Sequence, residues 1–479
     1  NWKLARDGFT RLFPKNDSGF VDWQKVAAFA ALRKNFCVIS GGPGTGKTHT
    51  VAKILTLLIE QADSVKLRIK LAAPTGKAAA RLQESLRNEK SKMDCDLFVR
   101  AQLPEEAGTI HRLLGSLPDS TTFRHDAENP LAADVVIVDE ASMVGLPLMA
   151  KVVAAVPKTA RLILLGDKDQ LASVEAGAVL GEICNAGFAH DVSAAFADEY
   201  KAFTGETIAS KHRAGNQALA DCIVELQKNY RFAEKSGIHQ LSQAVNQGDT
   251  AEAMNVLGKA GAGSGEIGWQ VLPELARLKE TLRPIVLKHF APCFQSSDPE
   301  TILRTLEKFR ILCAVRKGHF GVETINRLVE EILREAGCIQ TDSDWYAGRP
   351  VMITRNDYNV RLFNGDIGVA LPDATGAMRV FFRTEDEGIR PVSTLRLPEH
   401  ETVYAMTVHK SQGSEFGNVL LVLPERDSPV LTRELIYTGL TRASSGVQLW
   451  LREEIFKMAI SRRVERTSGL RDALWNTRA

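Results

Sequence analysis

The sequence predicts an α/β protein with two parallel-sheet halves and a small β-rich insert in the second half. Through residues 35–185, short apolar runs alternate with amphipathic helical segments, the pattern of a parallel sheet covered by helices. Apolar runs at 311–318, 417–424 and 446–452 offer strands for a second sheet. Between them, residues 346–403 consist of short strands separated by Asn-Asp, Asn-Gly and Pro-Asp turns, which is typical of a small β-barrel.

The composition is that of an ordinary multi-domain globular protein of 479 residues. Its 60 Lys and Arg against 58 Asp and Glu neither require nor exclude a nucleic-acid partner. The seven cysteines form no CxxC pair, which disfavours a disulfide framework or a zinc site. Without a membrane-length apolar run or a signal-peptide pattern, we expect a cytoplasmic protein. Because the sequence begins at Asn1 rather than Met, we expect that an N-terminal piece precedes it.

Residues 41–48, "GGPGTGKT", match the phosphate-binding pattern GxxxxGK[ST]. The run "NFCVIS" before it predicts a buried strand, and "THTVAKILTLLIEQ" after it has helical spacing. Glycines let backbone N–H groups turn toward the phosphates of ATP, and the helix N-terminus adds a favourable dipole. The residues expected at the nucleotide are Gly41, Gly42, Pro43, Gly44, Thr45, Gly46, Lys47 and Thr48. Lys47 is expected on the β- and γ-phosphates and Thr48 on Mg²⁺.

The stretch "DVVIVDEASM" at 134–143 supplies the acidic residues that such a site needs. A buried strand ends at Asp139, expected to hold Mg²⁺, and Glu140, expected to orient or deprotonate the attacking water. A further strand, "RLILLGDKDQL" at 161–171, ends at Gln170, whose amide can sense hydrolysis. These elements define an NTPase, a class that includes switch proteins, transport motors and helicases.

Two arginines far along the chain narrow the class of NTPase. Arg231 lies in "LQKNYRF" and Arg442 in "YTGLTRA". Both are expected to act as trans-domain arginine fingers, which stabilise the charge that develops in phosphoryl transfer. Either arginine alone would more often form a surface ion pair, so the prediction depends on both arginines occurring together with the other motifs.

Together, these stretches resemble the motifs of superfamily 1 helicases, in that family's order from residue 22 to residue 443. They are "DWQKVAAF", "GGPGTGKT", "AAPTGKAAARL", "GTIHRLLG", "VDEASM", "LLGDKDQL", "NYRF", "MTVHKSQGSEF" and "YTGLTRA". The resemblance implies that Gln24 reads the adenine and Tyr230 stacks on it. It also implies that Arg231 and Arg442 contact the γ-phosphate and that Gln170 couples nucleotide state to the DNA track.

Within that superfamily, stretches such as "GDKDQLASVEAGAVLG" and "VHKSQGSEF" resemble the RecD branch. The resemblance implies two RecA-like motor domains with an SH3-like insert, movement 5′ to 3′ on single-stranded DNA, and RecB and RecC subunits as partners at duplex ends. The domain limits expected on this basis are 1–20 as the remnant of an N-terminal domain, 21–215 as the first motor with a hairpin insert at about 115–132, 216–345 plus 404–479 as the second motor, and 346–403 as the SH3-like insert.

Candidate DNA contacts lie where strands pass into loops, because a strand grip without sequence preference needs phosphate contacts and a few stacking or wedge groups. The family places three of its motifs against the strand, and the residues in them are Pro74, Thr75, Lys77, Thr109, His111, Arg112, Thr407, His409 and Lys410. The two histidines stand among Thr, Lys and Arg, so metal ligation is not expected. Phe123, in a stretch where relatives carry a duplex-splitting pin, is the candidate wedge.

Other functions stay open at this point. The same motor could act as a stand-alone RecD-like helicase, as an RNA motor, or as a regulatory subunit that binds ATP without moving on DNA. Two acids in "TDSDWY" at 341–346 lack a lysine at nuclease spacing, so we expect no nuclease site in this chain.

Overall fold

The chain forms two units, each built on a parallel sheet. The computed structural model describes residues 2–14, 20–62, 65–117, 120–173, 177–184, 190–210, 216–232, 236–260, 265–357, 359–384, 388–464 and 468–475. The first unit comprises residues 1–231 and 465–479, and the second comprises residues 232–464. No helix in these described ranges is long and apolar enough to cross a membrane.

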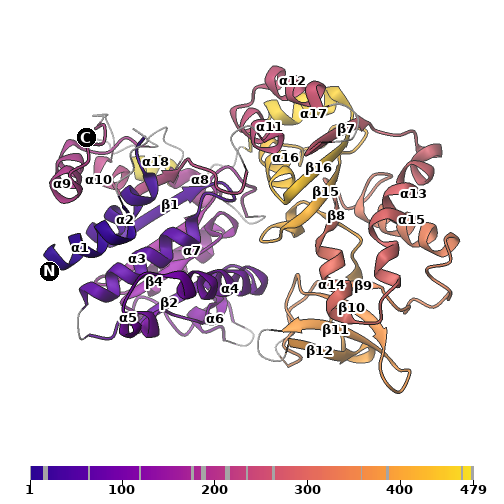
Figure 1. Ribbon diagram of the computed structural model, residues 1–479, viewed down its shortest axis with the longest axis horizontal. Helices are drawn as coiled ribbons and strands as arrows, with labels where there is room; N and C mark the ends of the chain where they lie inside the picture. Colours follow the sequence, from indigo (N-terminus) through magenta and orange to yellow (C-terminus); the bar gives the residue numbers. More distant parts are fainter. Residues whose placement is uncertain are drawn as a thin grey trace. The chain divides into compact units, whose positions relative to one another are not determined.

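The first unit is centred on a six-stranded sheet in the order β3-β2-β4-β5-β1-β6, in which every pair of neighbours is parallel (Figure 1). The strands are β1 (Phe36–Gly41), β2 (Ile69–Ala73), β3 (Gly108–Thr109), β4 (Val135–Val138), β5 (Arg161–Gly166) and β6 (Ile223–Leu226). Parallel pairing brings the loops that follow all six strands to one edge of the sheet.

Helices cover both faces of this sheet, which explains why its strands are mostly apolar. In β4, Val135 and Ile137 enter the core on one face, while Val136 and Val138 enter a separate core on the other. The helices are α1 (Trp2–Leu12), α2 (Trp23–Arg33), α3 (Lys47–Gln61), α4 (Gly76–Lys92), α5 (Leu97–Gln102), α6 (Ile110–Leu114), η1 (Ala141–Met143), α7 (Leu146–Ala155), α8 (Val179–Cys184), α9 (Ala194–Thr204), α10 (Gln217–Ala220) and α18 (Leu470–Trp475).

The second unit has its own parallel sheet, in the order β14-β8-β15-β16-β7. Its strands are β7 (Ile267–Val271), β8 (Phe309–Cys313), β14 (Ala405–Thr407), β15 (Phe416–Val422) and β16 (Ala443–Leu451). Its helices are α11 (Gly237–Gln247), α12 (Thr250–Ala260), η2 (Leu275–Arg277), α13 (Leu278–His289), η3 (Ala291–Phe294), α14 (Pro299–Glu307), α15 (Val322–Glu335), η5 (His409–Ser411), α16 (Arg433–Leu440) and α17 (Glu453–Ser461).

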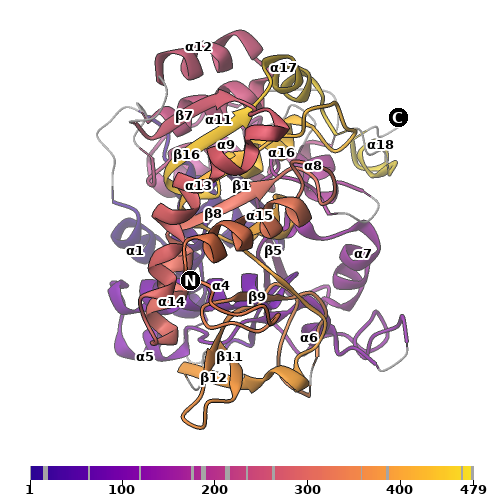
Figure 2. The same cartoon turned by 90° about the vertical axis from the view of Figure 1, so that its right-hand side faces the viewer.

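An antiparallel sheet in the order β12-β11-β10-β9-β13 is inserted between β8 and β14 of the second unit. Its elements are β9 (Pro350–Ile353), β10 (Ile367–Pro372), β11 (Met378–Thr384), β12 (Gly388–Ser393), η4 (Thr394–Arg396) and β13 (His400–Thr402). It has a small core of its own that includes Val351, Val380 and Phe382. Figure 2 shows this insert at one end of the second unit, beyond β8. The predicted fold class, two parallel-sheet halves and a small β insert, is confirmed.

The division between the units differs from the one expected at residues 215 and 216. Strand β6 pairs with β1 from Val38↔Ile223 to Gly41↔Leu226, so the chain stays in the first unit as far as residue 231. The C-terminal segment also returns to the first unit, where Ser468 donates its backbone N–H and its hydroxyl to Glu182. Assigning these two segments to the second motor was therefore wrong.

The segment expected as the remnant of an N-terminal domain is part of the first unit. Its helix α1 buries Phe9 and Leu12 in the same core as Ile54 of α3. Residues 1 and 15–19 of that prediction lie outside the described residues, as do 118 and 119 of the expected hairpin insert.

Candidate nucleotide site and strand-binding positions

The phosphate loop, residues 41–48, joins the end of β1 to the start of α3. Gly44 and Gly46 have φ of 83° and 80°, in the left-handed region that favours glycine. A Cβ at Gly44 would lie 2.4 Å from the Cβ of Arg231, and one at Gly46 would lie 2.4 Å from Nε2 of Gln24. Both glycines are therefore favoured by conformation, and Gly44 also by space, so the loop keeps the path that lets its N–H groups face an anion.

The ammonium group of Lys47 lies within this loop. Nζ donates to the carbonyl of Gly41 at 2.6 Å and to that of Gly42 at 3.2 Å. The hydroxyl of Thr45 also donates to the Gly42 carbonyl, at 2.8 Å. The ammonium group of Lys47 thus stands beside the backbone that is suited to hold phosphates.

Asp139 and Glu140 follow β4 at the same edge of the sheet. Oδ1 of Asp139 accepts a hydrogen bond from the backbone N–H of Glu140 at 2.8 Å, and Glu140 has φ of 50°. Burial, followed by the charge of Glu140, raises the pKa of Asp139 to about 6, and Lys47 opposes this rise.

These groups fit a magnesium ion held jointly with a nucleotide. The hydroxyl of Thr48 and the carboxylate of Asp139 are hard oxygen ligands, which Mg²⁺ prefers. The described residues contain no cluster of three or more His, Cys, Asp or Glu side chains that could hold a metal alone. Because Mg²⁺ is commonly bound by one or two protein oxygens and substrate phosphates, two such ligands are sufficient.

Replacing Asp139 with asparagine is expected to stabilise the metal-free protein at pH 8. The folded-state pKa of Asp139 lies above its ordinary value of 3.8, so ionising this carboxyl destabilises the fold. That cost is fully present above pH 6, shrinks as pH falls toward 4 and vanishes below it. Thermal unfolding in EDTA should show a gain on the order of 1–2 kcal/mol at pH 8 and a smaller gain at pH 5. An equal gain at both pH values would exclude ionisation as its cause.

Gln170 lies after β5 and is 5% exposed. Its Nε2 donates to Oδ2 of Asp167 at 3.0 Å, whereas its Oε1 is buried without a hydrogen-bond partner among the described residues. The segment after β5 also touches the one after β4, since a Cβ on Gly166 would lie 3.2 Å from the backbone N of Ser142. A buried amide with an unused acceptor next to the Asp139 segment suits the sensing role predicted for Gln170.

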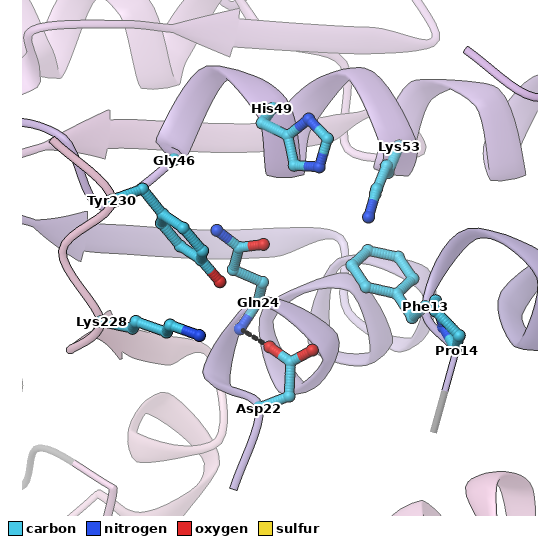
Figure 3. Close-up of a pocket in the computed structure, with 9 residues that line it drawn as sticks. All are labelled: Phe13, Pro14, Asp22, Gln24, Gly46, His49, Lys53, Lys228 and Tyr230. Atoms are coloured by element: carbon cyan, nitrogen blue, oxygen red, sulfur yellow. Dashed lines mark hydrogen bonds between the residues drawn. The ribbon is translucent and has the colours of Figure 1, made fainter. Parts of the chain in front are cut away.

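A cavity of about 550 Å³ opens beside the phosphate loop. It is lined by Phe13, Pro14, Asp22, Gln24, Gly46, His49, Lys53, Lys228 and Tyr230 (Figure 3). The Nε2 group of Gln24 donates to the carbonyl of Thr45 at 3.0 Å. The backbone N–H of Tyr230 donates to the carbonyl of Gly44 at 2.8 Å. In Figure 3 the Gln24 amide lies between the rings of Tyr230 and Phe13. The structure thus brings Gln24 and Tyr230 together, and the cavity is suited to a nucleobase and its ribose.

Arg231 is part of the first unit, so its expected trans-domain position was wrong. Asn229 links this segment to the loop: its Nδ2 donates to the carbonyl of Pro43 at 3.0 Å, and its Oδ1 accepts from the backbone N–H of Arg231 at 2.8 Å. The pairing of β6 with β1 carries the segment to this position.

Arg442 lies in the second unit and is 4% exposed. Its Nε donates to the carbonyl of Thr438 at 3.2 Å, and its Nη1 to that of Ser414 at 3.1 Å. It therefore joins the end of α16 to the segment that follows η5. Its contact with a γ-phosphate stays a prediction.

Three of the candidate strand contacts share one local arrangement. The hydroxyl oxygens of Thr75, Thr109 and Thr407 each accept the N–H of the residue three positions on, at 3.2 Å. Thr109 and Thr407 end the parallel strands β3 and β14, and Thr75 follows the end of the parallel strand β2 by two residues. Because a hydroxyl can donate while it accepts, each can still offer a proton to a phosphate. The other candidates lie in the same loops or first helical turns: Pro74, Lys77, His111, Arg112, His409 and Lys410.

Phe123 does not stand at a free tip. It forms an isolated antiparallel bridge with Ser116 and packs against the core of the first unit, with its ring centroid 5.8 Å from that of His111. The ring is therefore partly buried, and the wedge role of Phe123 stays a prediction.

Comparison with known proteins assigns the family. The AAA domain family matches residues 24–176, and the UvrD-like helicase C-terminal domain matches residues 402–450. The chain is 39% identical to the RecBCD enzyme subunit RecD of Haemophilus influenzae, over 96% of this chain and 73% of that subunit. It is 42% identical to the RecD subunit of Mycobacterium tuberculosis, over 98% of this chain and 75% of that subunit. The chain belongs to the RecD family.

The chain is also similar to a relative that is described as a helicase and not as a RecBCD subunit. The ATP-dependent RecD2 DNA helicase of Deinococcus radiodurans is 31% identical over 85% of this chain and 45% of that protein. The two matched domain families cover Gln24 to Gln170 on one side and the segment from Thr407 to Arg442 on the other. Most of the helicase motifs predicted from the sequence fall within these two regions, whereas "NYRF" at 229–232 falls in neither.

Several lining residues of the cavity were missed by sequence reasoning. His49 and Lys53 are spaced i and i+4 on α3, directly after Lys47, so a helical projection could have found them. Phe13 and Pro14 reach the cavity because α1 packs on α3, and nothing in the local sequence announces that contact.

Proposed function

We propose that this RecD-family chain is an ATP-dependent DNA helicase that moves 5′ to 3′ on single-stranded DNA. In this proposal it acts as a motor subunit, with RecB and RecC, of a complex that processes duplex ends in the bacterial cytoplasm. Support for the reaction comes from the relative described as an ATP-dependent RecD2 DNA helicase, and support for the partners from the relatives described as RecBCD enzyme subunits.

The observation that carries the proposal is the shared sheet edge of the first unit. The phosphate loop follows β1, Asp139 and Glu140 follow β4, and Gln170 follows β5. Thr75 and Thr109 follow or end β2 and β3 in the same parallel sheet. The residues proposed to bind the nucleotide and those proposed to bind the strand thus lie along one edge, which supports a short path from the γ-phosphate to the strand.

In this mechanism, each protein residue at the nucleotide site has one role. Lys47 would neutralise the β- and γ-phosphates, Asp139 and Thr48 would hold Mg²⁺, and Glu140 would orient the attacking water. Gln24 and Tyr230 hold the adenine. Arg231, together with Arg442 of the second unit, stabilises the charge of the transferred phosphoryl group.

The test is ATP hydrolysis by the purified chain with and without single-stranded DNA, followed by unwinding of duplexes with 5′ or 3′ tails. We expect DNA to stimulate turnover, and unwinding only from the 5′ tail. Turnover that ignores DNA would favour a regulatory, non-translocating subunit, and stimulation by RNA would favour an RNA motor. Activity of the chain alone would fit a stand-alone helicase as well, which addition of RecB and RecC would then distinguish.

A further inference from the structure

Two cations at the sheet edge of the second unit share one carboxylate. Nζ of Lys410 lies 2.8 Å from Oε1 of Glu401, and Nη2 of Arg316 lies 3.4 Å from Oε2 of the same side chain. Lys410 belongs to a predicted strand-binding motif, whereas Arg316 is in no motif identified from the sequence. Arg316 also has its Nε 3.1 Å from Oε1 of Glu323.

The topology explains why Arg316 and Lys410 meet. Strands β8 and β14 are parallel neighbours and end together, with Cys313 opposite Thr407. Arg316 follows the first strand by three residues, and Lys410 follows the second by three. Both side chains therefore leave the same edge of the sheet, where the hydroxyl of Thr407 also lies.

Glu401 comes from a different element, the last strand of the insert, and its backbone is firmly held. Asn326 of α15 donates Nδ2 to the carbonyls of Thr402 and Ala405, at 3.0 and 3.1 Å, and accepts the N–H of Ala405 at 2.7 Å. The buried guanidinium of Arg310 donates to the carbonyl of Val403. The junction between insert and motor is thus fixed directly after Glu401.

The energies favour exchange of partners at this cluster. The side chains of Lys410 and Arg316 are 30% and 59% exposed, and ion pairs of that kind contribute only about 0.2–1 kcal/mol. A phosphodiester offers the same anionic oxygens as Glu401 and gains from counterion release when it replaces that carboxylate. Glu401, with 21% of its side chain exposed, stays near the cations and repels the incoming phosphate.

We propose that Arg316 is a further strand-binding residue beside Lys410, and that Glu401 of the insert competes with the DNA phosphate for both cations. This inference rests on the proposed function. Glu401 weakens the grip of this unit, which suits a motor that must release the strand in every cycle. The insert thereby sets how tightly Arg316 and Lys410, in the loops after β8 and β14, hold DNA.

Glu401→Gln in the full chain tests this competition, with binding of a fluorescent oligothymidylate measured across a salt series without nucleotide. We expect affinity to rise about three- to tenfold, because loss of the carboxylate frees Lys410 and leaves Arg316 beside Glu323 alone. The slope of log affinity against log salt should become steeper by about 0.7 for each additional phosphate that the freed cations neutralise. Arg316→Gln should do the opposite and weaken binding.

Glu399→Gln is the matched control, because Glu399 is exposed, lies two residues away and forms no ion pair with any residue that the structure describes. It should leave affinity and salt slope unchanged. Adding Lys410→Gln to Glu401→Gln should remove most of the rise in affinity. Unchanged or weaker binding by Glu401→Gln, or a rise equal to that of Glu399→Gln, would overturn the inference while the proposed motor stands. Failure of the unaltered chain to bind DNA would instead overturn the proposed function.

Discussion

Lys47→Gln is expected to abolish ATP turnover while the protein stays folded. The ammonium of Lys47 lies 2.6 Å from the carbonyl of Gly41, beside the backbone groups suited to the phosphates. A glutamine is shorter and uncharged, so it cannot neutralise the charge that spreads over the γ-phosphate oxygens in phosphoryl transfer. Loss of one such preorganised electrostatic group lowers turnover by at least about a hundredfold. Steady-state ATPase activity at saturating single-stranded DNA measures the effect.

The control for this variant separates the loss of Lys47 from the phosphate loop from the change in net charge. Lys151 is exposed on α7, so Lys151→Gln removes the same charge without touching the phosphate loop. It should turn over ATP as the unaltered protein does. Thermal unfolding of both variants should stay near that of the parent. ATPase activity of Lys47→Gln close to that of Lys151→Gln would remove Lys47 from the mechanism.

The nucleotide site could be predicted closely because its elements are local. The segment "VVIV" reads as a buried strand because Val135 and Ile137 face one core while Val136 and Val138 face another, so all four must be apolar. The loop after β1 needs glycine at two left-handed positions, which leaves a recognisable pattern in the sequence. Such patterns involve only a few neighbouring residues, so they can be recognised without knowledge of the fold.

What could not be predicted depends on pairing between distant segments. Strand β6, "IVEL", is short, and only its pairing with β1 places Arg231 on the phosphate loop rather than in the other unit. Strand β7, "IGWQV", is an edge strand that is exposed at its end, so its apolar pattern is weak. The sequence places Phe123 in a loop, but the structure pairs it with Ser116 and packs its side chain against the core.

The Arg316–Glu401–Lys410 cluster illustrates the same limit for function. Its three residues come from a loop after β8, from the insert and from η5, and no spacing in the sequence relates them. Motif reasoning found Lys410 but assigned it to DNA without its carboxylate partner. The strength of a grip depends on such partners as much as on the cation itself.

Glu140→Gln is expected to abolish turnover and leave ATP binding intact. At φ of 50° the backbone of residue 140 is strained for any side chain of this shape, so a change from glutamate to glutamine alters the charge and not the conformation. Without its carboxylate the residue cannot take the proton of the attacking water, an effect of about a hundred- to ten-thousandfold. The substitution also removes a charge that raises the pKa of Asp139, so the magnesium ligand should ionise at lower pH.

Two measurements on the same preparation decide between chemistry and structure for Glu140. Single-turnover hydrolysis reports the chemical step, and competition with a fluorescent nucleotide reports binding. The exposed Glu128→Gln is the matched control and should behave as the unaltered chain in both. Loss of nucleotide binding together with hydrolysis would mean that Glu140 holds the site in shape. Hydrolysis at the parent rate would place the group that activates the water elsewhere at this sheet edge, with Gln170 as the next residue to replace, because its amide oxygen is buried there without a partner among the described residues.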